Sequence, residues 1–466
     1  MDADRRHYDL VAIGSGPAGQ KAAICAAKLG KKVAVVDRHD HIGGVSLHSG
    51  TIPSKTLREA VMYLSGFRQR GLYGKDYRLK ESVSVVDLVR RVRPVLSHEV
   101  EVVRAQLKRN GVDVLHGAAT FADARTLDVD GPKGKLRVTA DHILIACGTR
   151  PASNADIPFD GKRVFNSDQL ALVADIPKHL IVVGGGVIGL EYASMLTALG
   201  GQVTVIEGRK TVLDFVDAEL VEALTFHMRR HGVTFRLGEK VTSVRCDTRV
   251  TAELESGKTV QADALLYAVG RQGNADRLQL DNAGLTYDAR GRIAVNADFQ
   301  TAVPHIYAAG DVIGFPSLAS TSMEQGRLAS CHMFGTPLRQ HAELLPYGIY
   351  TLPEISTVGR NEQELTAARV PYEVGIARYE ELAKAQMIGD QIGLLKLLFD
   401  PKSLQLLGVH ALGDQAAEII HIGQAVLALG GTLAYFRDAV FNYPTLAEAY
   451  KVAALDGLNK VARLQG

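Results

Sequence analysis

Two segments of the chain carry the residue types and spacing of a phosphate-binding loop. In the first, an apolar strand runs into Gly14, Gly16 and Gly19, and a second strand closes on Asp37. The first glycine makes a tight turn, the second admits a pyrophosphate, and the third lets the following helix pack on the strand. The helix N-terminus offers free N–H groups to phosphates, and the terminal carboxylate accepts hydrogen bonds from a ribose.

The same pattern returns without a gap 170 positions later, at Gly184, Gly186, Gly189 and Glu207. A single G-x-G-x-x-G motif is a weak indication of nucleotide binding. Two copies, each between a strand and a helix and each followed by an acid, indicate two dinucleotide sites. The alternative is a pair of glycine-rich turns in an α/β fold without a ligand. We expect one dinucleotide to be held tightly and the other to exchange.

A third segment, GGVSLHSGTIPSKTLRE at 43–59, combines glycines with hydroxyls and a cation. Lys55 follows Thr51 by four residues, one helical turn, so both side chains face the same way. One interpretation is a cofactor site. The other is an ordinary helix start in which Ser46 or Thr51 caps the helix.

The composition narrows the class of protein. A length of 466 residues predicts about three domains, and a formal charge of +2 without a basic tract argues against nucleic acid. The apolar runs stop well short of the ~18 residues of a membrane span. The N-terminus runs from a polar stub into a strand, without a secretory signal, so we expect a cytoplasmic protein.

Metal and disulfide chemistry are not expected from the sequence. His39 and His41 form an H-x-H pair without further ligands nearby. The cysteines are far apart and share no metal or redox spacing, and the first two are expected to be small buried residues. They are Cys25, Cys147, Cys246 and Cys331.

Between the two glycine loops, residues 84–110 predict a long amphipathic helix with Pro94 as a break. Residues 111–141 alternate apolar and polar side chains and predict β-structure, in which 116–121 bring the backbone near a nucleotide. A buried strand then ends at Gly148.

These motifs together resemble the flavin-dependent disulfide oxidoreductases. The similarity is carried by both glycine loops, by GTIPSK at 50–55, by the GTRP segment at 148–151 and by TAVPHIYAAGD at 301–311. It implies an α/β, glutathione reductase-like fold with two Rossmann-like domains and an α+β dimerisation domain. The implied segments are 1–152 (FAD-binding, first part), 153–274 (NAD(P)-binding), 275–339 (FAD-binding, second part) and 340–466 (dimerisation).

The resemblance implies FAD in the first site and NAD(H) or NADP(H) in the second. The residues it assigns to FAD are Gly14, Gly16, Gly19, Asp37, Gly44, Ser46, Thr51, Lys55, Ala119, Gly148, Asp311, Leu318 and Ala319. Those assigned to the nicotinamide dinucleotide are Gly184, Gly186, Gly189, Glu207, Arg209 and Gly270.

The resemblance also assigns catalytic roles. A lysine near flavin N5, here Lys55, stabilises the negative charge that arrives with hydride, and a glutamate, here Glu191, holds it. Tyr443 and Glu448 stand in the closing segment, where disulfide reductases carry a histidine and a glutamate. Phenols ionise far above neutral pH, so a tyrosine is a poor general base there.

Departures from the family pattern indicate the reaction. Ser46 and Thr51 stand where disulfide reductases have their two cysteines, and Tyr443 stands where they have histidine. Reduction of a disulfide or of mercury by that route is therefore not expected. The whole chain most closely resembles the soluble pyridine nucleotide transhydrogenases (Si-specific), which implies hydride exchange between NADPH and NAD⁺ through FAD.

Two other functions stay open at this stage. One is an NAD(P)H:acceptor reductase that passes electrons to quinones, dyes or oxygen, and the other is a flavoprotein that binds nucleotides without turnover. Glu207 suits the 2′-hydroxyl of NAD(H) and repels a 2′-phosphate, whereas Arg209 and Lys210 could bind that phosphate. We therefore expect NAD(H) to bind more tightly than NADP(H). We also expect a homodimer or higher homo-oligomer that binds no nucleic acid, membrane or metal.

Overall fold

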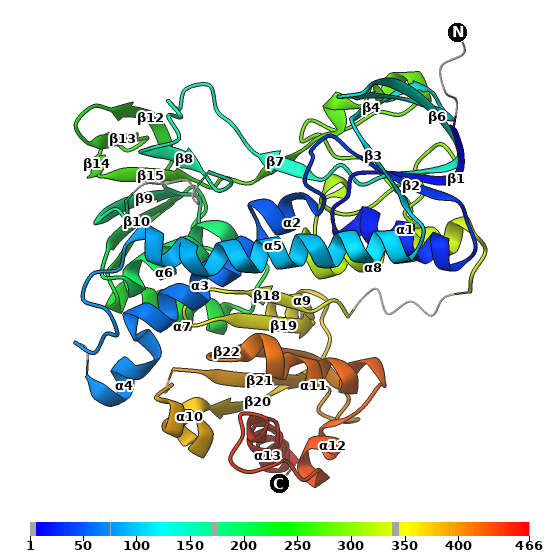
Figure 1. Ribbon diagram of the computed structural model, residues 1–466. Helices are drawn as coiled ribbons and strands as arrows, with labels where there is room; N and C mark the ends of the chain where they lie inside the picture. Colours follow the sequence, from blue (N-terminus) through cyan, green and yellow to red (C-terminus); the bar gives the residue numbers. More distant parts are fainter. Residues whose placement is uncertain (1–5, 75, 170–174, 338–343, 391, 466) are drawn as a thin grey trace. The chain divides into compact units, whose positions relative to one another are not determined.

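The computed structural model describes residues 6–74, 76–169, 175–337, 344–390 and 392–465 (Figure 1). The chain divides into two compact units. Unit 1 comprises Met1–Leu57, Val89–Ser153 and Gly270–Gln340, and unit 2 comprises Arg58–Leu88, Asn154–Val269 and His341–Gly466. The predicted boundary at 339–340 lies outside the described residues, and the division into four functional segments stays a prediction.

Unit 1 is built on one mixed sheet with strand order β3-β2-β1-β6-β5-β4, and β17 pairs with β6. Strands β3, β2, β1, β6 and β17 are parallel, whereas β4 and β5 pair antiparallel. Their bounds are β1 (Arg6–Ile13), β2 (Val33–Asp37), β3 (Asp113–His116), β4 (Ala118–Asp123), β5 (Thr126–Gly131), β6 (Gly134–Ile145) and β17 (Ile306–Ala308). The predicted β-structure at 111–141 is confirmed.

Two helices of this unit, α1 (Pro17–Lys28) and α8 (Ala319–Met333), pack backbone against backbone. A Cβ on Gly326 would lie 2.1 Å from the carbonyl oxygen of Ala18, so only glycine allows this approach. The short helix α2 (Gly44–His48) and the antiparallel pair of β7 (Thr149–Pro151) and β16 (Arg271–Gly273) complete the unit.

Two helices begin in one unit and end in the other, namely α3 (Thr51–Ser65) and α5 (Val85–Arg109). The predicted break at Pro94 is wrong, because α5 is one helix with Pro94 inside it. Pro94 cannot donate to the carbonyl of Arg90. Both residues are exposed, so water can donate a hydrogen bond to the carbonyl of Arg90. Val92 before the proline and Val103 and Leu107 after it are buried, and their packing keeps the helix continuous.

Unit 2 contains a parallel sheet of order β11-β10-β9-β15-β8, an antiparallel sheet β12-β13-β14 and a second antiparallel sheet β18-β19-β22-β21-β20. In Figure 1 the strands of the last of these are yellow to orange, and the orange α11 and the red α13 pack against it.

The strands of unit 2 are β8 (Val164–Asn166), β9 (His179–Val183), β10 (Gln202–Glu207), β11 (Val233–Leu237), β12 (Val241–Cys246), β13 (Val250–Leu254), β14 (Thr259–Ala262), β15 (Ala264–Tyr267), β18 (Tyr347–Ile349), β19 (Ile355–Gly359), β20 (Glu373–Arg378), β21 (Leu394–Phe399) and β22 (Leu406–Leu412). Its helices are α4 (Arg70–Tyr73), α6 (Val187–Ala198), α7 (Ala218–Arg230), α9 (Glu362–Ala367), α10 (Ala383–Ile388), α11 (Ala416–Ala428), α12 (Leu433–Asp438) and α13 (Glu448–Gln465). Among the described residues, no helix is long and apolar enough to cross a membrane.

A buried lysine joins the C-terminal sheet of unit 2 to the start of α7 and to α9. Lys396 on β21 is fully buried, and its Nζ donates to Asp217 (2.9 Å), Glu219 (3.0 Å) and Glu362. Burial acts to lower the pKa of Lys396, but the three carboxylates outweigh it and raise that pKa. Asp217 is also buried and caps α7 by accepting the N–H of Glu219. The ammonium group therefore neutralises an acid that would otherwise be buried alone.

We predict that Lys396→Met destabilises the protein by about 3 to 5 kcal/mol, because removing one partner leaves a buried carboxylate uncompensated. Thermal unfolding of the purified holoprotein measures the effect. Lys402→Met, at an exposed lysine of the same sheet region, serves as the control and should change stability by less than about 0.5 kcal/mol. Equal unfolding temperatures for the two variants would contradict the prediction.

Candidate functional site

The glycine loop of unit 1 connects β1 to α1. Gly14 has φ +112°, and a Cβ there would lie 2.3 Å from the carbonyl oxygen of Ala146. A Cβ on Gly19 would lie 1.9 Å from the carbonyl oxygen of Gly14, so helix and strand touch through their backbones. A Cβ on Gly16 would meet nothing within 4 Å. The second glycine thus faces open space at the uncapped N-terminus of α1, where a pyrophosphate would fit.

The loop of unit 2, between β9 and α6, has the same geometry. Gly184 has φ +106°, and a Cβ there would lie 2.4 Å from the carbonyl oxygen of Ala268. A Cβ on Gly189 would lie 2.1 Å from the carbonyl oxygen of Gly184, and one on Gly186 would meet nothing within 4 Å. The 170-residue repeat of the sequence is therefore also a repeat of backbone structure.

In each unit, the acid that ends the second strand of the repeated motif accepts a hydrogen bond from the glycine loop of the same motif. Asp37 accepts the backbone N–H of Ser15 at 2.9 Å, and Glu207 accepts that of Gly185 at 2.7 Å. The hydroxyl of Ser15 also donates a hydrogen bond to the Asp37 carboxylate, and it accepts one from the backbone N–H of Gly43 at 2.9 Å. Sequence reasoning did not single out Ser15, although its place inside the G-x-G motif was a usable signal.

Arg209 holds Glu207 on its other side. The backbone N–H of Arg209 donates to Glu207 at 2.9 Å and its Nε at 3.1 Å, while its Nη1 donates to Asp214 at 2.8 Å. Burial works to raise the pKa of Glu207, but the hydrogen bonds from Arg209 and Gly185 outweigh it, so this pKa lies below its ordinary value. Lys210 is exposed.

The segment that follows β2 folds against the first glycine loop. A Cβ on Gly44 would lie 2.9 Å from the Cα of Gly16, so the start of α2 lies beside the second glycine. The hydroxyl of Ser46 donates to the carbonyl of Gly43 at 3.1 Å, and Thr51 begins α3. This contact is not an N-cap, because the hydroxyl donates to a carbonyl and the N-cap residue of α2 is Gly43, without a side-chain hydrogen bond. The cofactor interpretation stays open.

Asp311 and the N-terminus of α8 lie in the same unit. The hydroxyl of Thr149 donates to Asp311 at 3.3 Å and that of Ser322 at 3.5 Å, while Nε of Arg271 donates to the Thr149 hydroxyl at 2.8 Å. Burial raises the pKa of Asp311. Leu318 caps α8 without a side-chain hydrogen bond, so the first N–H groups of this helix are available to a ligand.

Thr321, in the first turn of α8, has a buried hydroxyl oxygen without a hydrogen-bond partner among the described residues. Such a group is costly unless a ligand or water satisfies it. It was missed because it lies just past the recognised motif, in the segment STSMEQG. Together with the open space at Gly16, it fits a site that holds a polar cofactor.

The remaining residues assigned to FAD also belong to unit 1. Ala119 is buried on β4, Gly148 has φ +63° with nothing within 4 Å of a Cβ, and Ala319 begins α8. Gly270, assigned to the nicotinamide dinucleotide, has φ +112° and accepts the N–H of Ala152 at 3.0 Å. Lys55 lies half-buried on α3.

Three of the predicted catalytic residues belong to unit 2. Glu191 is buried on α6 and accepts the N–H of Tyr350 at 2.9 Å. Lys55 belongs to unit 1, so its pairing with Glu191 stays a prediction. Tyr443 is 71% exposed, whereas Glu448, the first residue of α13, has a buried carboxylate oxygen without a partner among the described residues.

The cysteines differ from expectation in two respects. The Sγ atoms of Cys25 on α1 and Cys331 on α8 lie 3.5 Å apart, and Cys25 and Cys147 are half-buried rather than buried. Burial raises the pKa of Cys147 to about 12 and that of Cys331 to about 11, which makes both poor nucleophiles. Among the described residues, the acids with metal-ligand spacing are those already bound by Lys396.

The fold and its two glycine loops define a class of protein, the oxidoreductases that bind two dinucleotides. The family "Pyridine nucleotide-disulphide oxidoreductase" matches residues 8–326, and its dimerisation domain matches residues 345–454. A "Soluble pyridine nucleotide transhydrogenase" of Mycobacterium bovis (strain BCG / Pasteur 1173P2) is 55% identical over 462 residues, covering 98% of this chain and 99% of the relative. The protein of the same name from Escherichia coli O9:H4 (strain HS) is 45% identical, covering 97% and 98%.

Among solved structures, LpdA from Mycobacterium tuberculosis aligns with a TM-score of 0.89 at 27% identity, covering 97% of this chain and 99% of that one. The Cu(II) complex of the flavoprotein disulfide reductase RclA from Escherichia coli aligns with a TM-score of 0.87 at 27% identity, covering 97% and 99%. The chain belongs to the FAD-dependent pyridine nucleotide-disulphide oxidoreductases, and within them to the soluble pyridine nucleotide transhydrogenases. Its dimerisation domain supports a homo-oligomer.

We predict that Gly186→Ala folds normally but weakens NAD⁺ binding about tenfold or more, because the added methyl group fills the space a pyrophosphate needs. Gly189→Ala, whose Cβ meets a carbonyl oxygen instead, should lower the unfolding temperature. Titration of NAD⁺ and thermal unfolding separate the two effects. Unchanged NAD⁺ affinity in a folded Gly186→Ala variant would overturn the assignment of this loop.

Proposed function

We propose that the chain catalyses ping-pong hydride exchange between NADPH and NAD⁺ with FAD in unit 1, and that no redox disulfide takes part. FAD would supply the reversible hydride chemistry of this exchange, and the residues of unit 1 named above would hold it. The observation that carries this proposal is the pair of hydroxyls, Ser46 and Thr51, in a segment that otherwise keeps the pattern of a disulfide reductase. Hydroxyl groups cannot cycle through a disulfide, so the nicotinamide site is the remaining route for electrons.

The chain's own residues supply binding and electrostatics. The N-terminus of α1 and the open space at Gly16 would receive the pyrophosphate of FAD, while Asp37 and Asp311 would accept hydrogen bonds from its hydroxyl groups. We assign to Lys55 the stabilisation of negative charge at the flavin and to Glu191 the positioning of Lys55.

We further propose that the homo-oligomer is a dimer in the cytoplasm and that Tyr443 and Glu448 face the flavin site of the neighbouring subunit. Supporting this, Tyr443 is largely exposed and Glu448 has a buried oxygen without a partner among the described residues. A group from a second subunit would satisfy that oxygen.

A second candidate, an NAD(P)H:acceptor reductase, is favoured by one observation. Glu207 is held between Gly185 and Arg209, so its negative charge lies where a 2′-phosphate of NADP(H) would arrive. Arg209 is itself engaged by Asp214, and using it for the phosphate requires breaking that contact. An enzyme confined to NADH could not balance two nucleotide pools, and it would then need another acceptor.

Anaerobic mixing of the holoenzyme with NADPH, followed by NAD⁺, tests the proposal. We expect the flavin absorbance to bleach and then to recover, and Lys55→Met to slow both phases about 100- to 1,000-fold. Recovery only with quinone or oxygen would favour the acceptor reductase, and absence of bleaching would favour a nucleotide-binding protein without turnover. Rapid reduction of lipoamide or glutathione disulfide would refute the proposed route.

We predict tighter binding of NADH than of NADPH, and that Glu207→Gln shifts the ratio of kcat/KM towards NADPH by about tenfold. The reason is that the variant removes charge repulsion of roughly 1 kcal/mol or more. Because the pKa of Glu207 lies below its ordinary value, its charge persists as pH falls. The preference should therefore stay constant from about pH 7 to 9, above the second pKa of a phosphate monoester at about 6.

Asp214→Asn, which changes the other partner of Arg209, is the matched control and should leave discrimination against the 2′-phosphate in place. NADPH bound at least as tightly as NADH by the unmodified protein would contradict the prediction.

A further inference from the structure

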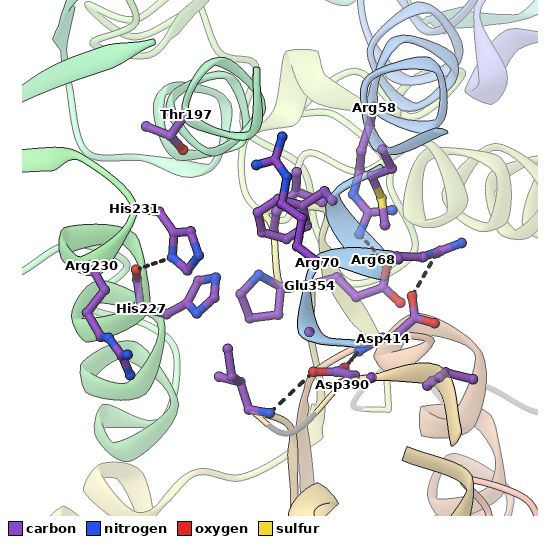
Figure 2. Close-up of a pocket in the computed structure, with 18 residues that line it drawn as sticks. Arg58, Arg68, Arg70, Thr197, His227, Arg230, His231, Glu354, Asp390 and Asp414 are labelled. Atoms are coloured by element: carbon purple, nitrogen blue, oxygen red, sulfur yellow. Dashed lines mark hydrogen bonds and ion pairs between the residues drawn. The ribbon is translucent and has the colours of Figure 1, made fainter. Parts of the chain in front are cut away.

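A cavity and a pair of thiols take no part in the proposed reaction. The cavity, of about 460 Å³, lies in unit 2 and is shown in Figure 2, and in its wall Glu354 pairs with Arg58 at 3.2 Å. This carboxylate already has its counter-ion, so it needs no cationic ligand. The thiols are those of Cys25 and Cys331 in unit 1, and they lie close enough to react with each other.

The two cysteines face each other from neighbouring helices. Cys25 lies on α1 and Cys331 on α8, which pack side by side in Figure 1, and their Sγ atoms are 3.5 Å apart. The same helices touch through their backbones at Ala18 and Gly326, one to two turns before the cysteines. A disulfide needs its sulfurs about 2.05 Å apart. A shift of about 1.5 Å, supplied by side-chain rotation and a small movement of the helices, would bring them to that distance.

The two thiols differ in their access to solvent. Cys25 is half-buried, whereas Cys331 is only 4% exposed. Burial raises the pKa of Cys331 to about 11, and the hydrogen bond with Cys25 acts in the same direction. The guanidinium of Arg327, 4.0 Å from the Cys331 sulfur, acts to lower that pKa. A small oxidant dissolved in water therefore reaches Cys25 first, and Cys331 is placed to react second.

We propose that Cys25 and Cys331 form a disulfide when the protein meets a hydroperoxide, and that this bond fastens α1 to α8. With hydrogen peroxide, the Cys25 thiolate attacks one oxygen, the O–O bond breaks, and Cys25 becomes a sulfenic acid while hydroxide leaves. Sγ of Cys331 then attacks Sγ of Cys25, the S–O bond breaks, and a second hydroxide leaves. The protons of the two thiols convert both hydroxides to water, so two thiols are oxidised and one peroxide is reduced.

The rate of the second step is set by two opposing factors. The high pKa of Cys331 keeps its thiolate fraction small at neutral pH. The sulfur that it attacks, however, belongs to a neighbouring residue of the same chain, so the step is intramolecular. We therefore expect the disulfide to form over minutes to hours rather than within a catalytic cycle.

The two helices that the bond would join both begin at residues assigned to FAD. The N-terminus of α1 follows the open space at Gly16, and Ser322 in the first turns of α8 donates to Asp311. The bond would connect the C-terminal halves of these helices, at positions far apart in the sequence. A cross-link of that kind restricts the unfolded chain strongly. Oxidation should thus stabilise unit 1 against unfolding, and this effect is separate from hydride exchange, which needs no thiol.

Peroxide treatment of the FAD-loaded holoprotein tests the proposal. The protein is reduced, freed of reductant, exposed to hydrogen peroxide, quenched with catalase and alkylated under denaturing conditions. We expect the loss of two of the four thiols and a peptide pair that links Cys25 to Cys331 within one chain. We also expect the unfolding temperature to rise by about 5 °C and to return when dithiothreitol is added.

Cys25→Ser and Cys331→Ser should each abolish both the cross-link and the rise in unfolding temperature. The matched control is Cys246→Ser, at a half-buried cysteine of β12 in unit 2, and it should behave like the unmodified protein.

Three results would overturn the proposal: oxidation of Cys25 beyond the sulfenic acid without a cross-link, a disulfide that joins separate chains instead, or a cross-link that leaves the unfolding temperature unchanged. Each can be observed whether or not the protein exchanges hydride between NADPH and NAD⁺, so failure here is distinguishable from failure of the proposed function.

Discussion

The contact on which both nucleotide sites depend is the approach of a helix to the strand before it, through glycine alone. Gly19 lies against the carbonyl of Gly14, and Gly189 against that of Gly184, at distances that leave no room for a Cβ. This approach places the helix N-terminus at the end of the sheet, where its free N–H groups meet open space. It also brings the second strand's acid within hydrogen-bond distance of the loop.

The reaction that the site supports follows from which side chains lie beside the glycine loops and which are absent there. The segment beside the first loop presents Ser46 and Thr51 where thiols would be needed to move electrons to a disulfide. Two cysteines of unit 1, Cys25 and Cys331, lie together on α1 and α8, but burial keeps the pKa of Cys331 high. Exchange between two nicotinamides is the chemistry these residues support best.

Much of the frame could be predicted from the sequence, because a glycine loop is a local pattern with a local cause. Gly14 and Gly184 both lie in a turn between a strand and a helix, as their spacing predicts. Asp311 follows β17 by three residues and accepts a hydrogen bond from Ser322 on α8. The break expected at Pro94 did not occur, since the lost hydrogen bond faces solvent and buried side chains on both sides hold the helix. At this position, tertiary packing outweighs the helix-breaking tendency of proline.

What sequence reasoning missed depends on contacts between distant segments. Lys396 finds its carboxylates at 217, 219 and 362, and no short pattern links these positions. Whether the hydroxyl of Thr321 has a hydrogen-bond partner likewise depends on segments distant in sequence, and none of the described residues supplies one. Such features depend on which partners a side chain lacks, and a linear sequence does not encode that directly.

The near identity of the two loops has a consequence for ligand lifetimes. If one dinucleotide remains bound through thousands of turnovers while the other leaves in each, the loops cannot be the cause, since both offer the same backbone donors and the same room. The difference in dissociation rate must arise at the far end of each ligand, where the surrounding protein either encloses the ring system or leaves it accessible. Engineering the residence time of either nucleotide should therefore begin at that end, with the glycines left untouched.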